Sequence, residues 1–178
     1  MTQQIQAAIL ADIPRLQAIE VAAGRVFAEW GMAEVAAHAP PSAAEFGRYI
    51  ELEQAWVLRA QTNNAVVQAE PELAGFVLVE AVDGCAHIEQ LSVHPDFARR
   101  GLGAQLIEHV VQWAVLQKLA ALTLTTFAEL PWNAPYYRRC GFAELSIEQQ
   151  TLGLQEKRAH EARLGLDAWP RVCMRREL

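Results

Sequence analysis

One stretch of the chain, residues 91–104, joins an apolar strand, a turn with a proline, two arginines and the start of a long apolar helix. Arg99 and Arg100 precede the helix, and Gly101 and Gly103 lie where it begins. The first N–H groups of a helix have no partner within it, and the helix dipole favours negative charge there. Glycine keeps side chains away from those amides, and arginine adds fixed positive charge. The stretch therefore predicts a strand–turn–helix unit that can hold a pyrophosphate.

The same spacing is compatible with tight packing alone, because glycines often serve that purpose where a strand meets a helix. Two common phosphate motifs are excluded. A P-loop needs a Lys after its last glycine, and no Lys follows Gly103. A dinucleotide-binding turn needs a third glycine, and position 106 holds Leu106 instead.

A second segment, residues 131–142, follows a strand-like run at 122–127. Together with the first stretch it resembles the GNAT superfamily of acyl-CoA-dependent N-acyltransferases. The Arg-Arg-Gly-Leu-Gly-Ala turn at 99–104 is similar to that family's pyrophosphate loop. Asn133 and the Tyr-x-x-x-Gly-Phe pattern that begins at Tyr137 are similar to its later motif, where an Asn and a Tyr approach the cofactor. The opening strand and helix are also similar, so the resemblance covers essentially the whole chain.

The resemblance implies an α/β fold with a mixed central β-sheet flanked by α-helices, in a single domain over residues 1–178. It implies acetyl-CoA as co-substrate and direct attack on it, in a ternary complex, by the primary amine of a small molecule or peptide. The implied cofactor-binding residues are Leu91, Ser92, Val93, Arg99, Arg100, Gly101, Leu102, Gly103, Ala104, Asn133 and Tyr137. Ala98 departs from the Gln or Arg usual in the family at that position, so we expect one side-chain contact to be missing while the backbone contacts persist.

Amine chemistry needs a proton acceptor, because a lysine-like amine has a pKa of about 10.4 and only its neutral form attacks a thioester. Strand alternation over residues 85–93 places His87 and Glu89 on one face, upstream of the turn. In the family, acids or histidines on this strand often serve as the base, so we expect Glu89 to accept the proton. Two alternatives stay open: Glu89 is a salt-bridged or solvated carboxylate, or His87 is the base. A bulge in this strand would change which side chains share a face.

Tyr137 is the expected general acid, because its phenol can donate to the coenzyme sulfur as the C–S bond breaks. The alternative is an aromatic side chain that only packs on its helix, as Tyr136 beside it does. Asn133 is expected to bind the pantetheine arm, to cap its helix, or both. Several aromatic and acidic residues are weaker candidates for contact with the acceptor, with ordinary packing as the alternative: Phe27, Trp30, Phe46, Phe127, Glu129 and Trp132.

Composition limits the classes of protein to which the chain can belong. The 178 residues are 52% apolar, which suits one globular domain and excludes a disordered chain. No apolar run reaches the about 18–20 residues of a membrane span, and the N-terminus lacks the pattern of a signal peptide, so we expect a cytoplasmic protein without membrane contact. A net charge of −6 argues against nucleic acid as the main partner. Three scattered cysteines predict neither a disulfide framework nor a metal site.

Periodicity predicts a mixed order of strands and helices. The expected strands span 3–10, 55–60, 73–82, 85–93, 121–127, 142–148 and 171–175. The expected helices span 13–27, 42–52, 101–118, 133–140 and 154–164, with a break at 31–41. Turns are expected at 62–64 and at Asp83-Gly84, and a helical crossover should make the strands at 85–93 and 121–127 parallel. The oligomeric state is open, and the last strand offers an edge for a homodimer.

Two other functions remain to be distinguished from catalysis. A non-catalytic acyl-CoA-binding sensor needs the phosphate turn but neither an acid nor a base, so Tyr137 together with Glu89 favours the enzyme. A protein-interaction domain that keeps only the fold needs neither the glycines nor the arginines of residues 99–104.

Overall fold

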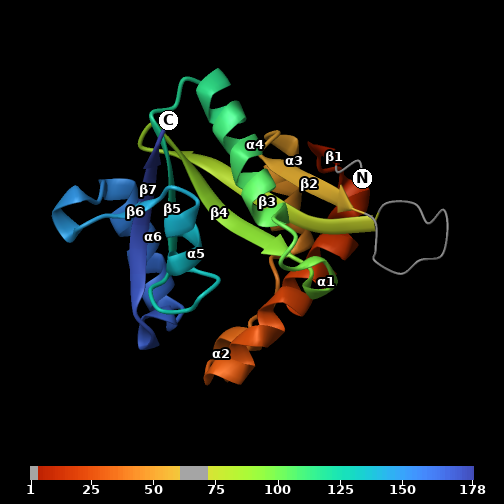
Figure 1. Ribbon diagram of the computed structural model, residues 1–178, viewed down its shortest axis with the longest axis horizontal. Coiled ribbons are helices and arrows are strands. Elements are labelled where there is room, and N and C mark those ends of the chain that lie inside the picture. The colour runs from red at the N-terminus through yellow and green to blue at the C-terminus, as the bar shows by residue number, and fades with distance from the viewer. Residues whose placement is uncertain (1–3, 61–71) are drawn as a thin grey trace. The chain divides into compact units, whose positions relative to one another are not determined.

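The computed structural model describes residues 4–60 and 72–178, which form a seven-stranded sheet flanked by helices (Figure 1). The sheet has the order β1-β2-β3-β4-β5-β7-β6. Its strands are β1 (Gln4–Ala7), β2 (Ala55–Ala60), β3 (Glu72–Val82), β4 (Cys85–Val93), β5 (Ala121–Phe127), β6 (Ala143–Glu144) and β7 (Arg171–Glu177). The helices are α1 (Ile13–Gly24), α2 (Ala33–Ala36), α3 (Ala43–Glu51), α4 (Leu102–Leu116), α5 (Ala134–Arg139) and α6 (Leu152–Arg163).

The pairing of the strands is mixed. β1 with β2, β2 with β3, β5 with β7 and β6 with β7 are antiparallel, whereas β4 and β5 are parallel. The parallel pair follows from the helical crossover α4, as the sequence predicts. The predicted α/β class, a mixed central sheet flanked by helices, is therefore confirmed.

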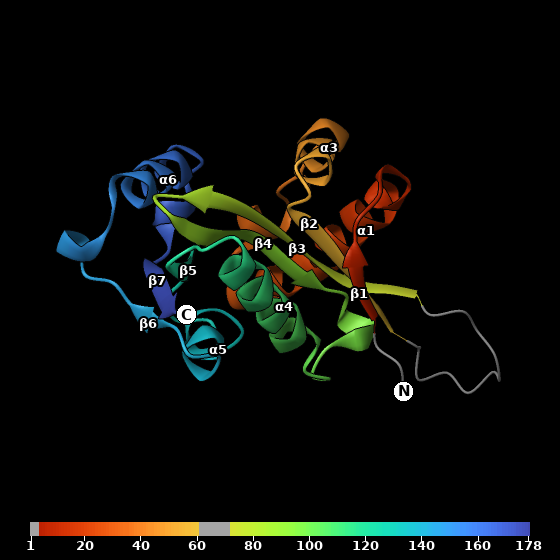
Figure 2. The ribbon, with the colours of Figure 1, turned by 90° about the horizontal axis from the view of Figure 1, so that it is seen from above.

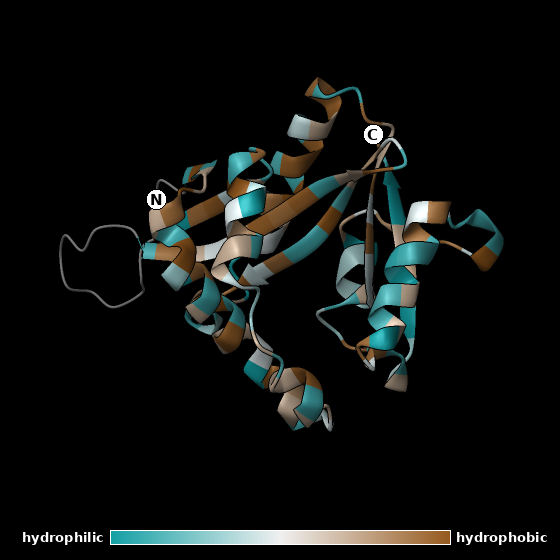
Figure 3. Cartoon of the chain, turned by 180° about the vertical axis from the view of Figure 1, so that it is seen from behind, coloured by the Kyte–Doolittle hydropathy of each residue, from teal (hydrophilic) through white to brown (hydrophobic). Residues whose placement is uncertain are grey.

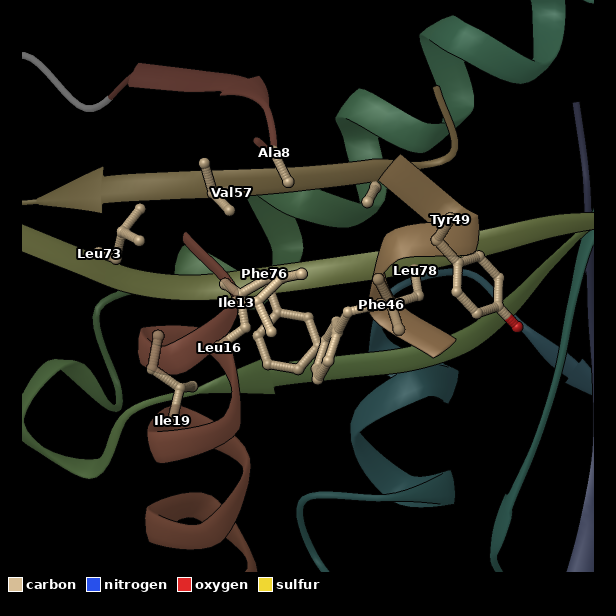
Figure 4. Packing of buried hydrophobic residues seen from close by; sticks show 11 residues of the cluster. Ala8, Ile13, Leu16, Ile19, Phe46, Tyr49, Val57, Leu73, Phe76 and Leu78 are labelled. Carbon is tan, nitrogen blue, oxygen red and sulfur yellow. The ribbon is translucent and has the colours of Figure 1, made fainter. Parts of the chain in front are cut away.

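The chain divides into two compact units, residues 1–79 with 90–106 and residues 80–89 with 107–178. In the first unit, α1 and α3 lie on the same face of β1 and β2 (Figure 2). Their apolar faces meet the sheet in one buried cluster, where Phe46 of α3 packs edge-on against Phe76 of β3 with ring centroids 5.5 Å apart (Figure 4). Phe46 is completely buried in this core, which supports the packing interpretation of that residue.

Helices α1 and α3 begin near the residues that the sequence predicts. Ser42 Oγ accepts a hydrogen bond from the Glu45 N–H at 3.2 Å, and the Glu45 carboxylate accepts one from the Ser42 N–H at 2.7 Å, which confirms the predicted capping box. Asp12 takes the N-cap position of α1 but does not cap it. Its carboxylate accepts a hydrogen bond from the Ile9 N–H at 3.0 Å and pairs with Arg59 at 3.4 Å.

In the second unit, β7 pairs with β5 along its whole length and with β6 at Met174 and Arg175. Pairing with a second copy is therefore not needed to complete β7. The hairpin between β3 and β4 turns at Asp83 and Gly84, both with positive φ, as the Asp-Gly pair predicts. The Asp83 carboxylate accepts a hydrogen bond from the Gly153 N–H at 2.8 Å, at the first turn of α6. Figure 3 shows α6 as a largely hydrophilic helix.

Some predicted boundaries differ from the structure. β1 is shorter than predicted, the first α-helix ends at Gly24, and residues Arg25–Trp30 continue as a 3-10 helix. The predicted break at 31–41 contains the short α2, and the strand predicted at 142–148 is reduced to Ala143–Glu144. The turn predicted at 62–64 lies outside the described residues. Within residues 4–60 and 72–178, no helix is both long and apolar enough to cross a membrane.

Candidate functional site

The turn before α4 has an unusual backbone. Arg99 has φ of 60° and Gly101 has φ of 73°, so two left-handed residues flank Arg100. Alternating conformations of this kind point successive N–H groups to one side and form a concave anion site. Helix α4 begins directly afterwards, with Leu102 as its first residue. The turn and the helix start therefore together have the backbone form of an anion site.

The side chains around the turn leave room for such an anion. A Cβ added at Gly101 would meet nothing within 4 Å. The Arg100 guanidinium lies over the Phe97 ring, 5.4 Å from its centroid. Arg99 is exposed and forms no ion pair with any residue of the described ranges. The turn thus carries two positive charges, one over an aromatic ring and the other at the surface.

The end of β4 lies tightly against β3. A Cβ at Gly75 would lie 2.8 Å from the Ser92 carbonyl oxygen, so only glycine permits this approach of the two backbones. The His94 N–H donates to the Ala74 carbonyl at 2.8 Å. Of the strand residues expected to offer backbone groups to pantetheine (Leu91, Ser92 and Val93), Ser92 and Val93 therefore lie directly against β3.

A carboxylate that sequence reasoning missed contacts this same segment. Glu20 of α1 accepts hydrogen bonds from the Ser92 hydroxyl and from Gln90 Nε2, the latter 2.9 Å from Oε1 and 3.0 Å from Oε2. Burial raises the pKa of the Glu20 carboxyl above its ordinary value, although the hydrogen bonds from Ser92 and Gln90 oppose this. The sequence offered one sign of this contact, because Glu20 is a charged residue on the apolar side of a predicted helix.

Glu89, the expected base, lies in an ion cluster of the second unit. Its Oε2 is 2.5 Å from Lys157 Nζ of α6, and its side chain is 39% exposed. Lys157 also pairs with Glu80 of β3. Burial lowers the pKa of Lys157, but Glu89 and Glu80 outweigh it and raise that pKa. The salt-bridge interpretation of Glu89 thus describes its contacts in the structure, and Lys157 is a partner that the sequence did not indicate.

His87, the alternative base, is buried. Its Nδ1 lies 3.0 Å from Thr123 Oγ1, and its Nε2 lies 3.8 Å from Glu89 Oε2. Burial, aided by the positive charge of Lys157, lowers the pKa of His87 to about 4. His87 is therefore neutral at physiological pH, and only 2% of its side chain is exposed to solvent.

Asn133 precedes α5 and does not cap it through its side chain. Its Nδ2 donates to Thr126 Oγ1 of β5 at 2.8 Å. Its Oδ1 is buried and accepts no hydrogen bond from any described residue. Because an unpaired buried acceptor is costly, this oxygen is a ready partner for an N–H donor such as a pantetheine amide.

Tyr137 lies on α5 among aromatic rings. Its ring centroid is 5.5 Å from that of Tyr136 and 5.7 Å from that of Phe142. Burial raises the pKa of the Tyr137 phenol, with a further contribution from Cys140, so the hydroxyl keeps its proton at physiological pH. Within the described residues, no group forms a hydrogen bond with this hydroxyl. Its proton is thus available to a ligand.

The weaker candidates for contact with an acceptor divide into buried and exposed residues. Phe127 is buried, with its ring against Trp169 and the Arg171 guanidinium 4.4 Å from its centroid. Trp30 is 53% exposed at the end of the 3-10 helix. Among the residues that the structure describes, no group of three side chains is arranged to hold a metal ion.

Comparison with known proteins gives one family. The sequence model of the acetyltransferase (GNAT) family matches residues 29–142. The chain is 30% identical over 86 residues to ribosomal protein bS18-alanine N-acetyltransferase of Salmonella typhimurium, covering 48% of this chain and 58% of that protein. It is 38% identical over 80 residues to mycothiol acetyltransferase of Acidothermus cellulolyticus, covering 44% of this chain and 23% of that protein. These alignments therefore span less than two thirds of either relative.

Solved structures share the fold at low sequence identity. N-acetylglutamate synthase from Neisseria gonorrhoeae, complexed with coenzyme A and N-acetyl-glutamate, matches with a TM-score of 0.70 and 18% identity, covering 100% of this chain and 35% of that one. At this identity the likeness shows the architecture alone.

Proposed function

The chain belongs to the acetyltransferase (GNAT) family, and on this premise we propose that it transfers the acetyl group of acetyl-CoA to a primary amine. The observation that carries the proposal is the turn before α4, with left-handed Arg99 and Gly101, open space at Gly101 and two arginines. This turn lies within the part of the chain that the family matches. We propose that all 178 residues serve as one domain for this reaction.

In this proposal the first unit holds the cofactor by backbone groups. The pyrophosphate would lie against the N–H groups of residues 99–104, with Arg99 and Arg100 neutralising its charge. Leu91, Ser92 and Val93 would offer strand N–H and carbonyl groups to the amides of pantetheine. Backbone contacts dominate, so Ala98 in place of a longer polar residue removes only a side-chain contact.

The later motif carries the groups proposed for the pantetheine arm and for the sulfur. Asn133 Oδ1, buried and without a partner among the described residues, would accept a hydrogen bond from a pantetheine amide. Tyr137 would act as the general acid. As the amine forms its bond to the carbonyl carbon and the C–S bond breaks, the electron pair goes to sulfur and the phenol proton follows it. A phenol that stays protonated at neutral pH suits this role.

The amine must lose a proton before or during attack, and Glu89 is the proposed acceptor on β4, directly or through a water molecule. Lys157 holds Oε2 of this carboxylate, and Oε1 takes no part in that ion pair. His87 is less suited, because it is buried and its Nδ1 already lies 3.0 Å from Thr123 Oγ1.

The acceptor is proposed to be the amine of a small molecule or a peptide. One relative is named for an alanine of a ribosomal protein and another for mycothiol, so the family does not fix the acceptor. The net charge of −6 favours a cationic amine over a nucleic acid. Three free thiols, Cys85, Cys140 and Cys173, fit the reducing cytoplasm, where we place the protein.

A screen of primary amines tests this proposal, with release of free thiol from acetyl-CoA as the readout. We expect at least one amine to accelerate thiol release. Binding of coenzyme A, measured as a rise in Tm, is the parallel readout. Coenzyme A binding without turnover on any amine would favour an acyl-CoA sensor, and no binding would refute both functions.

A further inference from the structure

Glu20 is a carboxylate without a positive partner. It lies on α1, and the side chains of Ser92 and Gln90, near the end of β4, donate hydrogen bonds to it. Both donors are neutral, and within the described residues no Lys, Arg or His pairs with this carboxylate. A half-buried carboxylate has lost much of its hydration and normally gains an ionic partner in return.

The other partly buried carboxylates among residues 4–60 and 72–178 each have a cationic partner. Glu161 is paired with Arg171 and Arg158, and Glu80 is paired with Lys157. Asp12 is paired with Arg59. Within the described residues, these three carboxylates are each paired with an Arg or a Lys, whereas Glu20 is paired with neither.

The hydrogen bonds of Glu20 leave a defined place for one more donor. Its two oxygens offer about four acceptor positions in all. Ser92 takes one position on Oε2, and Gln90 takes one on each oxygen. A single position remains on Oε1, which suits the one-point contact of an ammonium group better than the two-point contact of a guanidinium.

We propose that Glu20 binds the ammonium group of the acceptor amine and thereby selects cationic primary amines as substrates. This inference rests on the proposed acetyltransferase function. Gln90 and Ser92 belong to the strand end whose residues 91–93 are proposed to hold pantetheine, so an amine bound at Glu20 lies beside that strand segment. Glu20 is thus a recognition residue for the acceptor, and Glu89 keeps its separate proposed role in removing the proton.

The Glu20→Gln variant tests the inference because it removes the charge and keeps the shape. The new amide can still accept from Ser92, and the Gln90 amide can turn to pair with it. Loss of the ion pair should raise the KM of a cationic acceptor by about tenfold or more, with a smaller change in kcat. The Tm without ligand should equal or exceed that of the parent, because an unpaired carboxylate in a binding site costs stability.

The experiment measures three quantities in the parent, Glu20→Gln and the control Glu108→Gln. They are the Tm with and without coenzyme A, the affinity for alanine amide by calorimetry in the presence of coenzyme A, and the KM of the best amine from the screen. Glu108 is exposed and paired with Arg176 at 2.6 Å, so its variant removes the same charge elsewhere. We expect Glu20→Gln alone to weaken amine binding, with the coenzyme A shift preserved.

Unchanged amine affinity and KM in Glu20→Gln would overturn the inference, as would a parent that binds none of the cationic amines. A lowered Tm with unchanged KM would identify Glu20 as a structural link between α1 and β4. Failure of the proposed function has a different signature, since the parent itself would then turn over no amine in the screen, whether or not coenzyme A raises its Tm.

Discussion

Acidification should destabilise this protein through His87, a buried histidine on β4. Burial lowers the pKa of His87 from 6.5 to about 4. As the pH falls through 6.5, the unfolded chain binds a proton on this imidazole and the folded chain does not, so the free energy of unfolding decreases. The contribution of neutral His87 to the free energy of unfolding is complete above pH 6.5 and is lost progressively down to about pH 4.

The size of the effect follows from the two pKa values. Each tenfold difference in proton affinity corresponds to about 1.4 kcal/mol. The difference between a pKa of 6.5 and one of about 4 therefore lowers the free energy of unfolding by about 3.4 kcal/mol in full. Between pH 7 and pH 5 the expected loss is about 2 kcal/mol. His87 is 2% exposed, so solvent screening removes little of this.

Urea unfolding followed by tryptophan fluorescence at about pH 7 and pH 5 measures this loss. The His87→Gln variant has no imidazole, so its stability should fall by about 2 kcal/mol less than that of the parent over this range. Thr123→Val is the matched control, because it removes the partner 3.0 Å from Nδ1 but leaves the imidazole buried. It should keep the parent's pH dependence. Equal pH dependence in the parent and in His87→Gln would refute the reasoning.

Three further predictions concern the proposed reaction. Gly101→Val should abolish the rise in Tm that coenzyme A causes. Gly165→Val, at a glycine with the same left-handed backbone and open space around its Cβ position, should keep that rise, and an equal loss in both variants would point to backbone strain. Tyr137→Phe should lower kcat with little change in coenzyme A affinity, and the loss of kcat should be smaller for a thioester whose thiol is more acidic. Parallel losses of affinity and rate would instead make the phenol a binding group. Glu89→Gln should lower kcat by about 10²–10⁴-fold at neutral pH, and this loss should become smaller at high pH. A pH–rate profile identical to the parent's would show that Glu89 serves only as the ion-pair partner of Lys157.

Local signals in the sequence were sufficient for most of the fold. Ser42 and Glu45 form the predicted capping box, and the Asp83-Gly84 pair forms the predicted turn. β2, β4 and β5 begin and end at the predicted residues, and each is a run rich in apolar and β-branched residues. Boundaries failed where packing decides, as at Arg25–Trp30, which tightens into a 3-10 helix without a proline to mark the change and ends at the left-handed Gly31.

The partners of the site residues could not be predicted, because they come from distant parts of the chain. Glu20 and Gln90 are 70 residues apart, and Lys157 and Glu89 are 68 apart. Sequence periodicity places each side chain on a face of its own element but does not show what lies opposite. Charge on an otherwise apolar helix face was the one local sign of Glu20.

The central claim, transfer of an acetyl group from acetyl-CoA to an amine, is tested most directly by following the acetyl group itself. Acetyl-CoA labelled with carbon-13 in its acetyl group is incubated with the protein and the most active amine, and the label is located by NMR. The account predicts that the label moves from the thioester into an amide, more slowly with Tyr137→Phe than with the parent. A label that stays on coenzyme A, or that appears only as free acetate, would contradict it.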